Sequence, residues 1–164
     1  MSLKTDLTPE PFKHVINILP SASAYVGLAS GGALNFVREM FASGRFLEAA
    51  VQQGAGEHGP LVGEILDALN GMTRDDAQAL ATQLEQKAEG EKVEPRVLAK
   101  QAVADGWALV KALPGAQEFA RWVVDGARAA ALTRSGGFLG IGSKAEVDTE
   151  EQTALDELAA LLAA

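Results

Sequence analysis

Apolar residues recur along this chain at the spacing of amphipathic α-helices. The first stripe follows the i, i+3, i+4, i+7 pattern of one helix face: Phe12, Val15, Ile16 and Leu19. No segment shows the alternation of apolar and polar residues that is typical of a β-strand, and no repeat of fixed period is present. The pattern predicts an all-α fold, a single-domain multi-helical bundle of about seven or eight short helices over residues 1–164.

Prolines and glycines divide this pattern into segments. Thr8 and Pro9 mark the first start, because threonine is a common N-cap and proline suits the first helical position. Pro20 interrupts that helix and opens a second one that reaches about residue 29. Six further helices are expected, over about residues 33–53, 60–70, 73–89, 95–113, 115–134 and 149–163.

Capping signals mark several of these boundaries. Thr73 is followed three residues later by Asp76, which resembles a capping box at the start of a helix. Gly90 is the expected end of that helix. Asp148 or Thr149 is expected to cap the last helix.

Small residues share helix faces with large apolar ones in the second half of the chain. One face comprises Ala99, Val103, Gly106, Trp107 and Val110, and the next comprises Phe119, Trp122, Val123, Gly126, Ala127 and Ala130. Because small residues let a neighbouring backbone approach, we expect a tight helix crossing on the face that contains Gly126. The last helix has the apolar stripe Leu155, Leu158, Ala159 and Leu162.

One uncharged stretch raises the alternative of a membrane helix. Residues 15–37 carry no formal charge over a length that can span a bilayer. Pro20, Gly31, Gly32 and two asparagines leave the stretch only moderately hydrophobic. We therefore interpret it as three short helical pieces packed in a core, and we do not expect membrane association.

Composition narrows the function classes. The 164 residues include only one Tyr, two Trp and six Phe, so the core must be built largely from Ala, Leu and Val. A formal net charge of −8 disfavours nucleic acid as a partner. The absence of cysteine excludes disulfides, thiolate metal sites and a cysteine nucleophile. Since no apolar signal segment lies near the N-terminus, we expect an acidic cytoplasmic protein.

The stretch RSGGFLGIGSK, residues 134–144, differs from the rest of the chain and lies in a Gly-rich loop, 135–147, before the last helix. Gly137, Gly142, Ser143 and Lys144 come close to the phosphate-binding pattern G-x-x-x-x-G-K-[ST]. Serine and lysine stand in the reverse order, and the loop follows a helix instead of a strand. Both differences argue against nucleotide binding.

Two interpretations of this loop stay open. Its apolar side chains can fold back over the end of the bundle as a plug, the simpler interpretation, because connecting loops often need an apolar anchor. Alternatively they form an exposed tip, flanked by Arg134 and Lys144, that docks into a partner. The candidate interaction loop comprises Gly136, Gly137, Phe138, Leu139, Gly140, Ile141 and Gly142.

At this loop the chain resembles a family of bacterial all-helical proteins of unknown function. The shared feature is a Gly-Gly-Phe-Leu-Gly-x-Gly turn between an Ala-rich helix and an acidic helix cap, here residues 136–142. The resemblance implies bacterial origin and a helical fold, but no activity.

In overall layout of helices and in acidity the chain is also similar to TerB-type tellurite-resistance proteins. That likeness implies a stress response and a divalent metal, although no site motif matches residue by residue.

Candidate chemistry is sparse. The two histidines, His14 and His58, do not stand in the spacing of helical zinc or di-iron sites, and no G-x-S-x-G motif is present. His14 beside an apolar face is expected to be packed or half-exposed. The weak candidate ligands for a divalent metal are Glu57, His58, Glu64 and Asp67. No other cofactor and no catalytic residue is indicated, so we lean against an enzyme.

The chain end is acidic. Six residues there have no basic neighbour among them: Glu146, Asp148, Glu150, Glu151, Asp156 and Glu157. We therefore favour a non-enzymatic protein that acts through protein–protein contacts or self-association, with the Gly-rich loop and this acidic helix as the contact surface. The alternative is a TerB-like stress protein that binds a divalent metal or a small ligand.

Overall fold

The computed structural model describes residues 3–29, 59–135 and 147–164. These ranges contain helices and connecting turns, and no strand, so the predicted all-α class is confirmed. The helices are α1 (Leu3–Asp6), α2 (Pro9–Ile16), α3 (Ile18–Gly27), α6 (Pro60–Asn70), α7 (Arg74–Glu91), α8 (Pro95–Val110), α9 (Ala116–Ser135) and α10 (Thr149–Ala163). The count of seven or eight was predicted for the whole chain, whereas these eight lie in the described residues alone.

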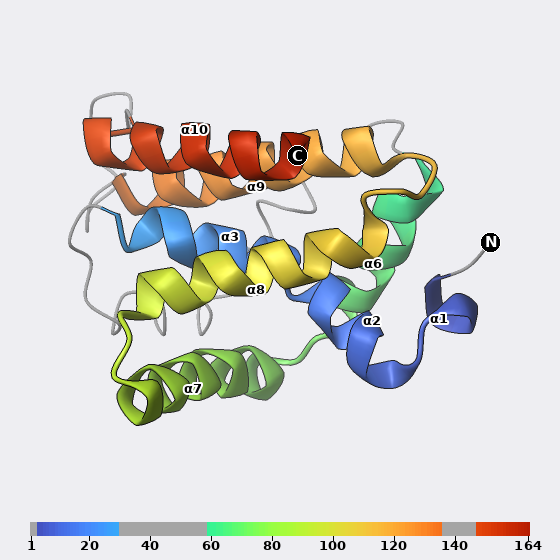
Figure 1. The fold of residues 1–164 in the computed structure, drawn as a ribbon, viewed down its shortest axis with the longest axis horizontal. Coiled ribbons are helices and arrows are strands. Elements are labelled where there is room, and N and C mark those ends of the chain that lie inside the picture. Colours follow the sequence, from blue (N-terminus) through green and yellow to red (C-terminus); the bar gives the residue numbers. More distant parts are fainter. Residues whose placement is uncertain (1–2, 30–58, 136–146) are drawn as a thin grey trace.

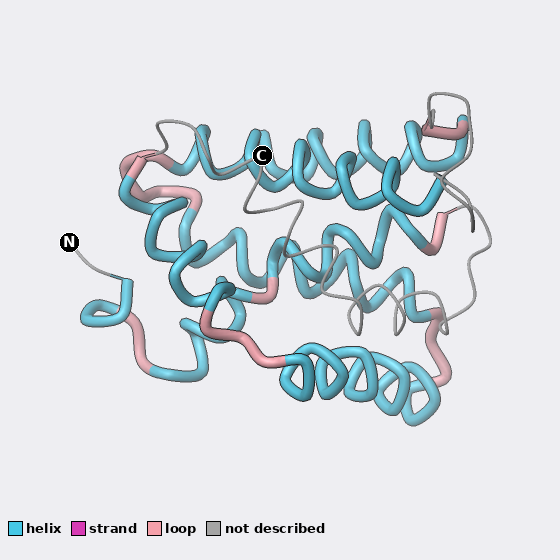
Figure 2. The backbone as a smooth tube through the Cα atoms, turned by 180° about the vertical axis from the view of Figure 1, so that it is seen from behind, coloured by secondary structure: helices cyan, strands magenta, loops and turns pink. Residues whose placement is uncertain are grey.

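Helix α3 is the centre of the molecule. It lies between α8 on one side and the pair α9 and α10 on the other, and it packs against all three (Figure 1). Helix α7 lies at the outer edge, beside α8, and α6 crosses the end of the bundle next to α2 and the start of α9 (Figure 2). The core is therefore built around a helix that has partners on opposite sides.

The sequence of α3 explains its central place. Its ten residues, ILPSASAYVG, carry no charge, and nine of them are buried. A helix that is apolar on all sides is stable only where neighbours cover every face.

In the described residues no helix is both long and apolar enough to cross a bilayer. The described part of the uncharged stretch, up to residue 29, consists of short packed helices, as predicted.

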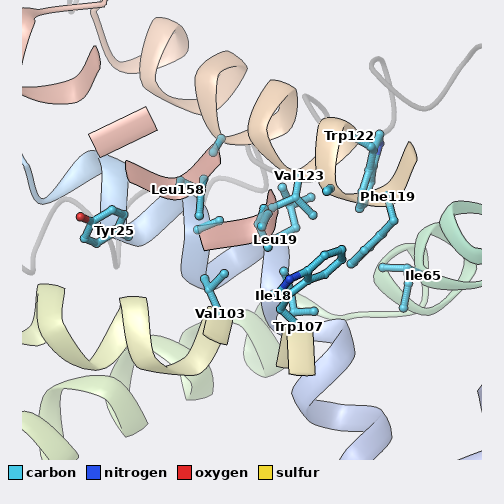
Figure 3. Packing of buried hydrophobic residues seen from close by; sticks show 14 of the residues in the cluster. Ile18, Leu19, Tyr25, Ile65, Val103, Trp107, Phe119, Trp122, Val123 and Leu158 are labelled. Carbon is cyan, nitrogen blue, oxygen red and sulfur yellow. The ribbon is translucent and has the colours of Figure 1, made fainter. Parts of the chain in front are cut away.

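Two glycines allow α8 and α9 to approach α3 closely. A Cβ atom on Gly106 of α8 would lie 2.5 Å from Ile18 Cγ1 and 2.7 Å from the His14 backbone oxygen. A Cβ atom on Gly126 of α9 would lie 2.7 Å from Leu19 Cδ1. Figure 3 shows Ile18 and Leu19 pointing into this packing from α3. The tight crossing expected at Gly126 is confirmed, and the same device operates at Gly106.

Both tryptophans belong to the same core. Trp107 on α8 is 4 % exposed and Trp122 on α9 is 3 % exposed. The ring of Trp122 stacks on that of Phe119 with 5.8 Å between the ring centroids (Figure 3). The predicted faces of α8 and α9 are thus the buried faces.

The start of α3 differs from the prediction. The break falls at Asn17, and α3 begins at Ile18 with Pro20 inside its first turn, whereas Pro20 was expected to open the helix. The first four N–H groups of a helix have no acceptor within it, so a proline costs little there. The helix expected over residues 33–53 lies outside the described residues.

The end of α7 also differs from the prediction. The helix continues through Gly90 to Glu91, and Lys92 takes the left-handed conformation with φ 54° and ψ 42°. The N–H of Val93 then donates to the Ala88 carbonyl oxygen at 3.1 Å, which closes the turn. Gly90 was therefore the wrong stop signal, because the left-handed position falls two residues later.

Two helix caps were predicted, whereas the first helix start and one stripe residue were not. The short helix α1 precedes the start expected at Thr8, and Thr8 precedes α2 without a side-chain cap hydrogen bond. Thr73 and Asp76 form the expected capping box, and Asp148 forms another with Glu151. In α10, Ala159 is exposed, whereas Ala154 is buried. The buried stripe of α10 is thus shifted around the helix from the predicted one.

Candidate functional site

The predicted interaction loop, residues 136–142, lies outside the described residues. Of the predicted Gly-rich loop 135–147, only the two end positions are described. The structure describes the backbone on either side of it. Helix α9 ends at Ser135, and Asp148 caps α10. Both of these helix ends lie at one end of the bundle, opposite to α1 and α6 (Figure 1).

The weak metal candidates are not brought together in the described part. Glu57 and His58 lie outside it. Glu64 and Asp67 both lie on α6, where Asp67 is exposed and Glu64 Oε2 accepts the Leu3 N–H at 2.7 Å. Across the described ranges no group of three or more His, Asp or Glu side chains could hold a metal ion. The TerB-like divalent-metal function stays a prediction.

An apolar groove lies where α1, α6 and the end of α8 meet. We call it the N-terminal groove, and its volume is about 390 Å³. Its lining residues are Leu3, Asp6, Leu7, Pro60, Leu61, Glu64, Leu109, Leu113 and Pro114. Leu3 and Leu61 are buried at its floor, each 6 % exposed, while Leu109 is 38 % exposed. Among the described residues, Leu109 and Val97 are the two large apolar side chains that are exposed.

Local turns place the walls of this groove. After α8, the Leu113 N–H donates to the Val110 carbonyl oxygen at 2.9 Å, and Gly115 adopts a φ of +84° that favours glycine. This tight turn brings Leu113 and Pro114 beside α6. On the other side, the Leu3 N–H to Glu64 hydrogen bond holds the single turn α1 against α6. Two segments distant in sequence thereby form one surface.

Two acidic residues are among the described lining of the groove. Asp6 is exposed and Glu64 is half-buried. The other lining residues are leucines and prolines. The groove is therefore suited to apolar side chains that carry a positive charge next to them.

A cluster of polar side chains near the C-terminal end of α3 is the second feature. The Tyr25 hydroxyl donates to Glu157 Oε2 on α10 and accepts from Arg96 Nη2 on α8 at 3.2 Å. Lys100 Nζ on α8 donates to the same Glu157 oxygen at 3.2 Å. The guanidinium carbon of Arg96 lies 4.6 Å from the centroid of the Tyr25 ring, within cation–π range. The cluster links α3, α8 and α10.

The cluster shifts the pKa values of its members in the directions that hold it together. Burial, and then the hydrogen bond to Glu157, raises the pKa of Tyr25 above its ordinary value. Hydrogen bonds from Tyr25 and Lys100 lower the pKa of Glu157, and the bond to Glu157 raises the pKa of Lys100. Tyr25 is thus held neutral while Glu157 and Lys100 are held charged.

These contacts change the picture of the acidic chain end. Glu157 pairs with Lys100 and with Arg96, whose Nη2 lies 3.9 Å from Glu157 Oε2. Glu151 is only 2 % exposed and belongs to the capping box. The acidic stretch is therefore not one uniform contact surface, because two of its members serve the packing and capping of α10.

A cleft between α7 and α8 is smaller and more polar than the groove. Its volume is about 170 Å³, and His14 from α2 is among its lining residues. His14 is exposed, whereas a packed or half-exposed histidine was expected. Lys87 pairs with Glu91 at 3.9 Å, and Asp105 accepts from Gln101 at 2.8 Å. Ligand pockets usually exceed about 300 Å³. The N-terminal groove is therefore the better candidate for a binding site.

Neither the groove nor the cluster was predicted from the sequence. Tyr25 is the single tyrosine, set in an uncharged helix, and such a residue signals a buried hydroxyl that needs a partner. For the groove the available signal was Leu109 and Leu113, because neither belongs to the predicted apolar face of α8.

No protein-family model, curated protein or solved structure matches the chain.

Proposed function

We propose that this chain is a protein-binding domain whose N-terminal groove receives apolar side chains of a partner. The observation that carries this proposal is the exposure of Leu109 beside a groove floored by leucines. Exposed apolar side chains gathered at a concave surface are typical of interaction sites. A non-enzymatic role in the bacterial cytoplasm is part of the proposal.

The groove also specifies the chemistry of its partner. Burying two or three large apolar side chains would supply most of the affinity. The rim carboxylates of Asp6 and Glu64 favour a lysine or arginine next to those side chains. The partner is therefore a short apolar peptide segment with basic flanks, carried by another protein or by another copy of this chain.

The polar cluster supports a structural role for the remaining charged groups. Glu157 accepts hydrogen bonds from both Tyr25 and Lys100. Its contacts join three helices that are distant in sequence, which favours a part in packing over a part in chemistry. We therefore place the proposed function at the N-terminal groove and not at this cluster.

Selection from a random peptide library displayed on phage tests this proposal. Peptides enriched on the wild-type protein should contain two or more large apolar residues next to Lys or Arg. The variant Leu109→Lys should bind them at least about tenfold more weakly, a loss of ~1.4 kcal/mol, because it removes apolar area and repels the basic flank.

Val97→Lys is the matched control, since Val97 is an exposed apolar residue of the same helix outside the groove. Its affinity for the enriched peptides should equal that of the wild type. A library that yields no binder, or binders that Leu109→Lys retains at full affinity, would contradict the proposed function.

A further inference from the structure

We propose that the occupant of the N-terminal groove is the loop Arg134–Lys144 of a second copy of this chain, so that copies associate head to tail. This inference rests on the proposed function, because it names the partner of the same groove. It joins the loop that the sequence singles out to the surface that the structure reveals.

The chemistry of the loop matches that of the groove. The sequence RSGGFLGIGSK contains three large apolar residues, two basic residues and no acidic one. The described lining of the groove consists of leucines and prolines together with the two carboxylates of Asp6 and Glu64. In a chain with a formal net charge of −8, an eleven-residue segment with a net charge of +2 is a local exception. Charge complementarity therefore favours this segment over the rest of the chain surface.

The loop cannot reach the groove of its own molecule. Pro114, beside the start of α9, lines the groove, whereas the loop follows the end of α9 at Ser135. A 20-residue helix such as α9 separates the two by about 30 Å. The sequence has eleven residues between the described positions 135 and 147, and half of the fully extended length of eleven residues is about 19 Å. The groove must receive the loop from another copy.

The position of the two surfaces sets the type of association. The described backbone that borders the loop lies at one end of the bundle, and α1 and α6, which line the groove, lie at the other (Figure 1). A contact between two different surfaces is heterologous, so each pair leaves one groove and one loop unused. Further copies can add until a ring closes or an open chain forms. The mass of the assembly should therefore increase with protein concentration.

The first test uses the peptide RSGGFLGIGSK labelled with fluorescein, and measures its fluorescence anisotropy on titration with protein. We expect binding to the wild type and to Val97→Lys, at least about tenfold weaker binding to Leu109→Lys, and weaker binding at higher salt. A peptide carrying Phe138→Asp should bind at least about tenfold more weakly than the unmodified one. Absence of binding by the unmodified peptide, or equal affinity for Leu109→Lys, would overturn the inference.

The second test uses complementary variants of the full chain and measures mass by light scattering after gel filtration. Leu109→Lys keeps the loop and Phe138→Asp keeps the groove, so each alone should be monomeric. Their equimolar mixture should form a dimer and nothing larger, because one working contact remains. Wild-type protein that stays monomeric at every concentration, or a mixture that stays monomeric, would overturn the head-to-tail arrangement.

The outcomes separate this inference from the proposed function. If library peptides bind the groove through Leu109 but RSGGFLGIGSK does not, the groove is a binding site and its partner is another protein. If neither binds, both proposals fall. If the Phe138→Asp chain is unfolded by circular dichroism, the mixing test is replaced by the peptide titration of the wild type and Leu109→Lys, because that titration does not use the Phe138→Asp chain.

Discussion

At its first turn α3 packs Ile18 and Leu19 against glycines, whereas near its last turn it places Tyr25 among three charged side chains. The first contact depends on the absence of a side chain at Gly106 and Gly126. The second depends on hydrogen bonds between polar side chains of three helices. One short helix therefore uses close apolar packing at one end and a hydrogen-bonded cluster at the other.

The difference teaches which contact supplies stability and which supplies specificity. Close packing of apolar atoms adds to stability wherever it is achieved. A polar cluster adds less net stability, but an unsatisfied member is costly, so it penalises every wrong rotation of α3 against α8 and α10. Substitutions at the two ends should separate these contributions, and we give them from the largest expected effect to the smallest.

Gly106→Ala should have the largest effect. Its added Cβ would meet the His14 backbone oxygen at 2.7 Å as well as Ile18, and a backbone atom cannot move away alone. We expect a net loss of about 2 kcal/mol in the free energy of unfolding, after the ~1 kcal/mol that alanine gains over glycine in a helix. Urea denaturation followed by circular dichroism measures it.

Gly63→Ala is the control for this prediction. In the described part of the chain, no atom beyond the chain neighbours and helix backbone of Gly63 lies within 4 Å of a Cβ placed there, so the helix preference of alanine should raise the free energy of unfolding by up to about 1 kcal/mol. The two glycine variants should therefore change stability in opposite directions. If Gly106→Ala is as stable as the wild type, the close approach at that crossing is not what holds α8 to α3.

Tyr25→Phe should have an intermediate effect. It removes the hydroxyl that donates to Glu157 and accepts from Arg96, while the ring remains in place for the cation–π contact. We expect a loss of about 1 kcal/mol in the free energy of unfolding. In a Glu157→Gln background the cost should be smaller, since the two residues act together. Equal costs in both backgrounds would show that the hydroxyl does not act through Glu157.

Glu157→Gln should have the smallest effect, and that effect should depend on pH. The pKa of Glu157 is lowered by folding, so its contribution is present above about pH 4.3, its unfolded pKa, and disappears as the pH falls through the lower folded pKa. The pKa values of Lys100 and Tyr25 are raised by folding. Their contributions are present below their unfolded pKa values, about 10.4 and 10, and disappear as the pH rises through the folded pKa values.

Urea midpoints of the wild type and Glu157→Gln, measured from acid to alkaline pH, check this prediction. The difference between the two proteins should be greatest between about pH 5 and 9 and should shrink on both sides. A difference that is the same at every pH would mean that the cluster contributes through packing and not through charge.

The sequence predicted those features whose cause is local. Thr73 with Asp76, and Asp148, could be recognised as caps because their partners are three residues away. Gly126 could be recognised because it shares a helix face with large apolar residues. Pro20 and Gly90 were misread because a proline is also allowed in a first turn and a glycine need not end a helix.

Features built from distant residues could not be predicted. Tyr25 meets Arg96 and Glu157 across 71 and 132 residues, and nothing in the local sequence of α3 indicates these partners. The groove likewise needs α1 and α6 to lie beside the turn after α8. Helix periodicity gives the buried face of each helix, but the way in which helices are arranged decides which of their remaining residues meet.

The two buried tryptophans give this protein an internal optical reporter. Trp107 and Trp122 are its only tryptophans, and they lie on the two helices that enclose α3. Intrinsic fluorescence therefore records both sides of the central helix at once. Replacing one tryptophan by phenylalanine would leave a single emitter, and stopped-flow refolding could then time the docking of α8 and of α9 separately.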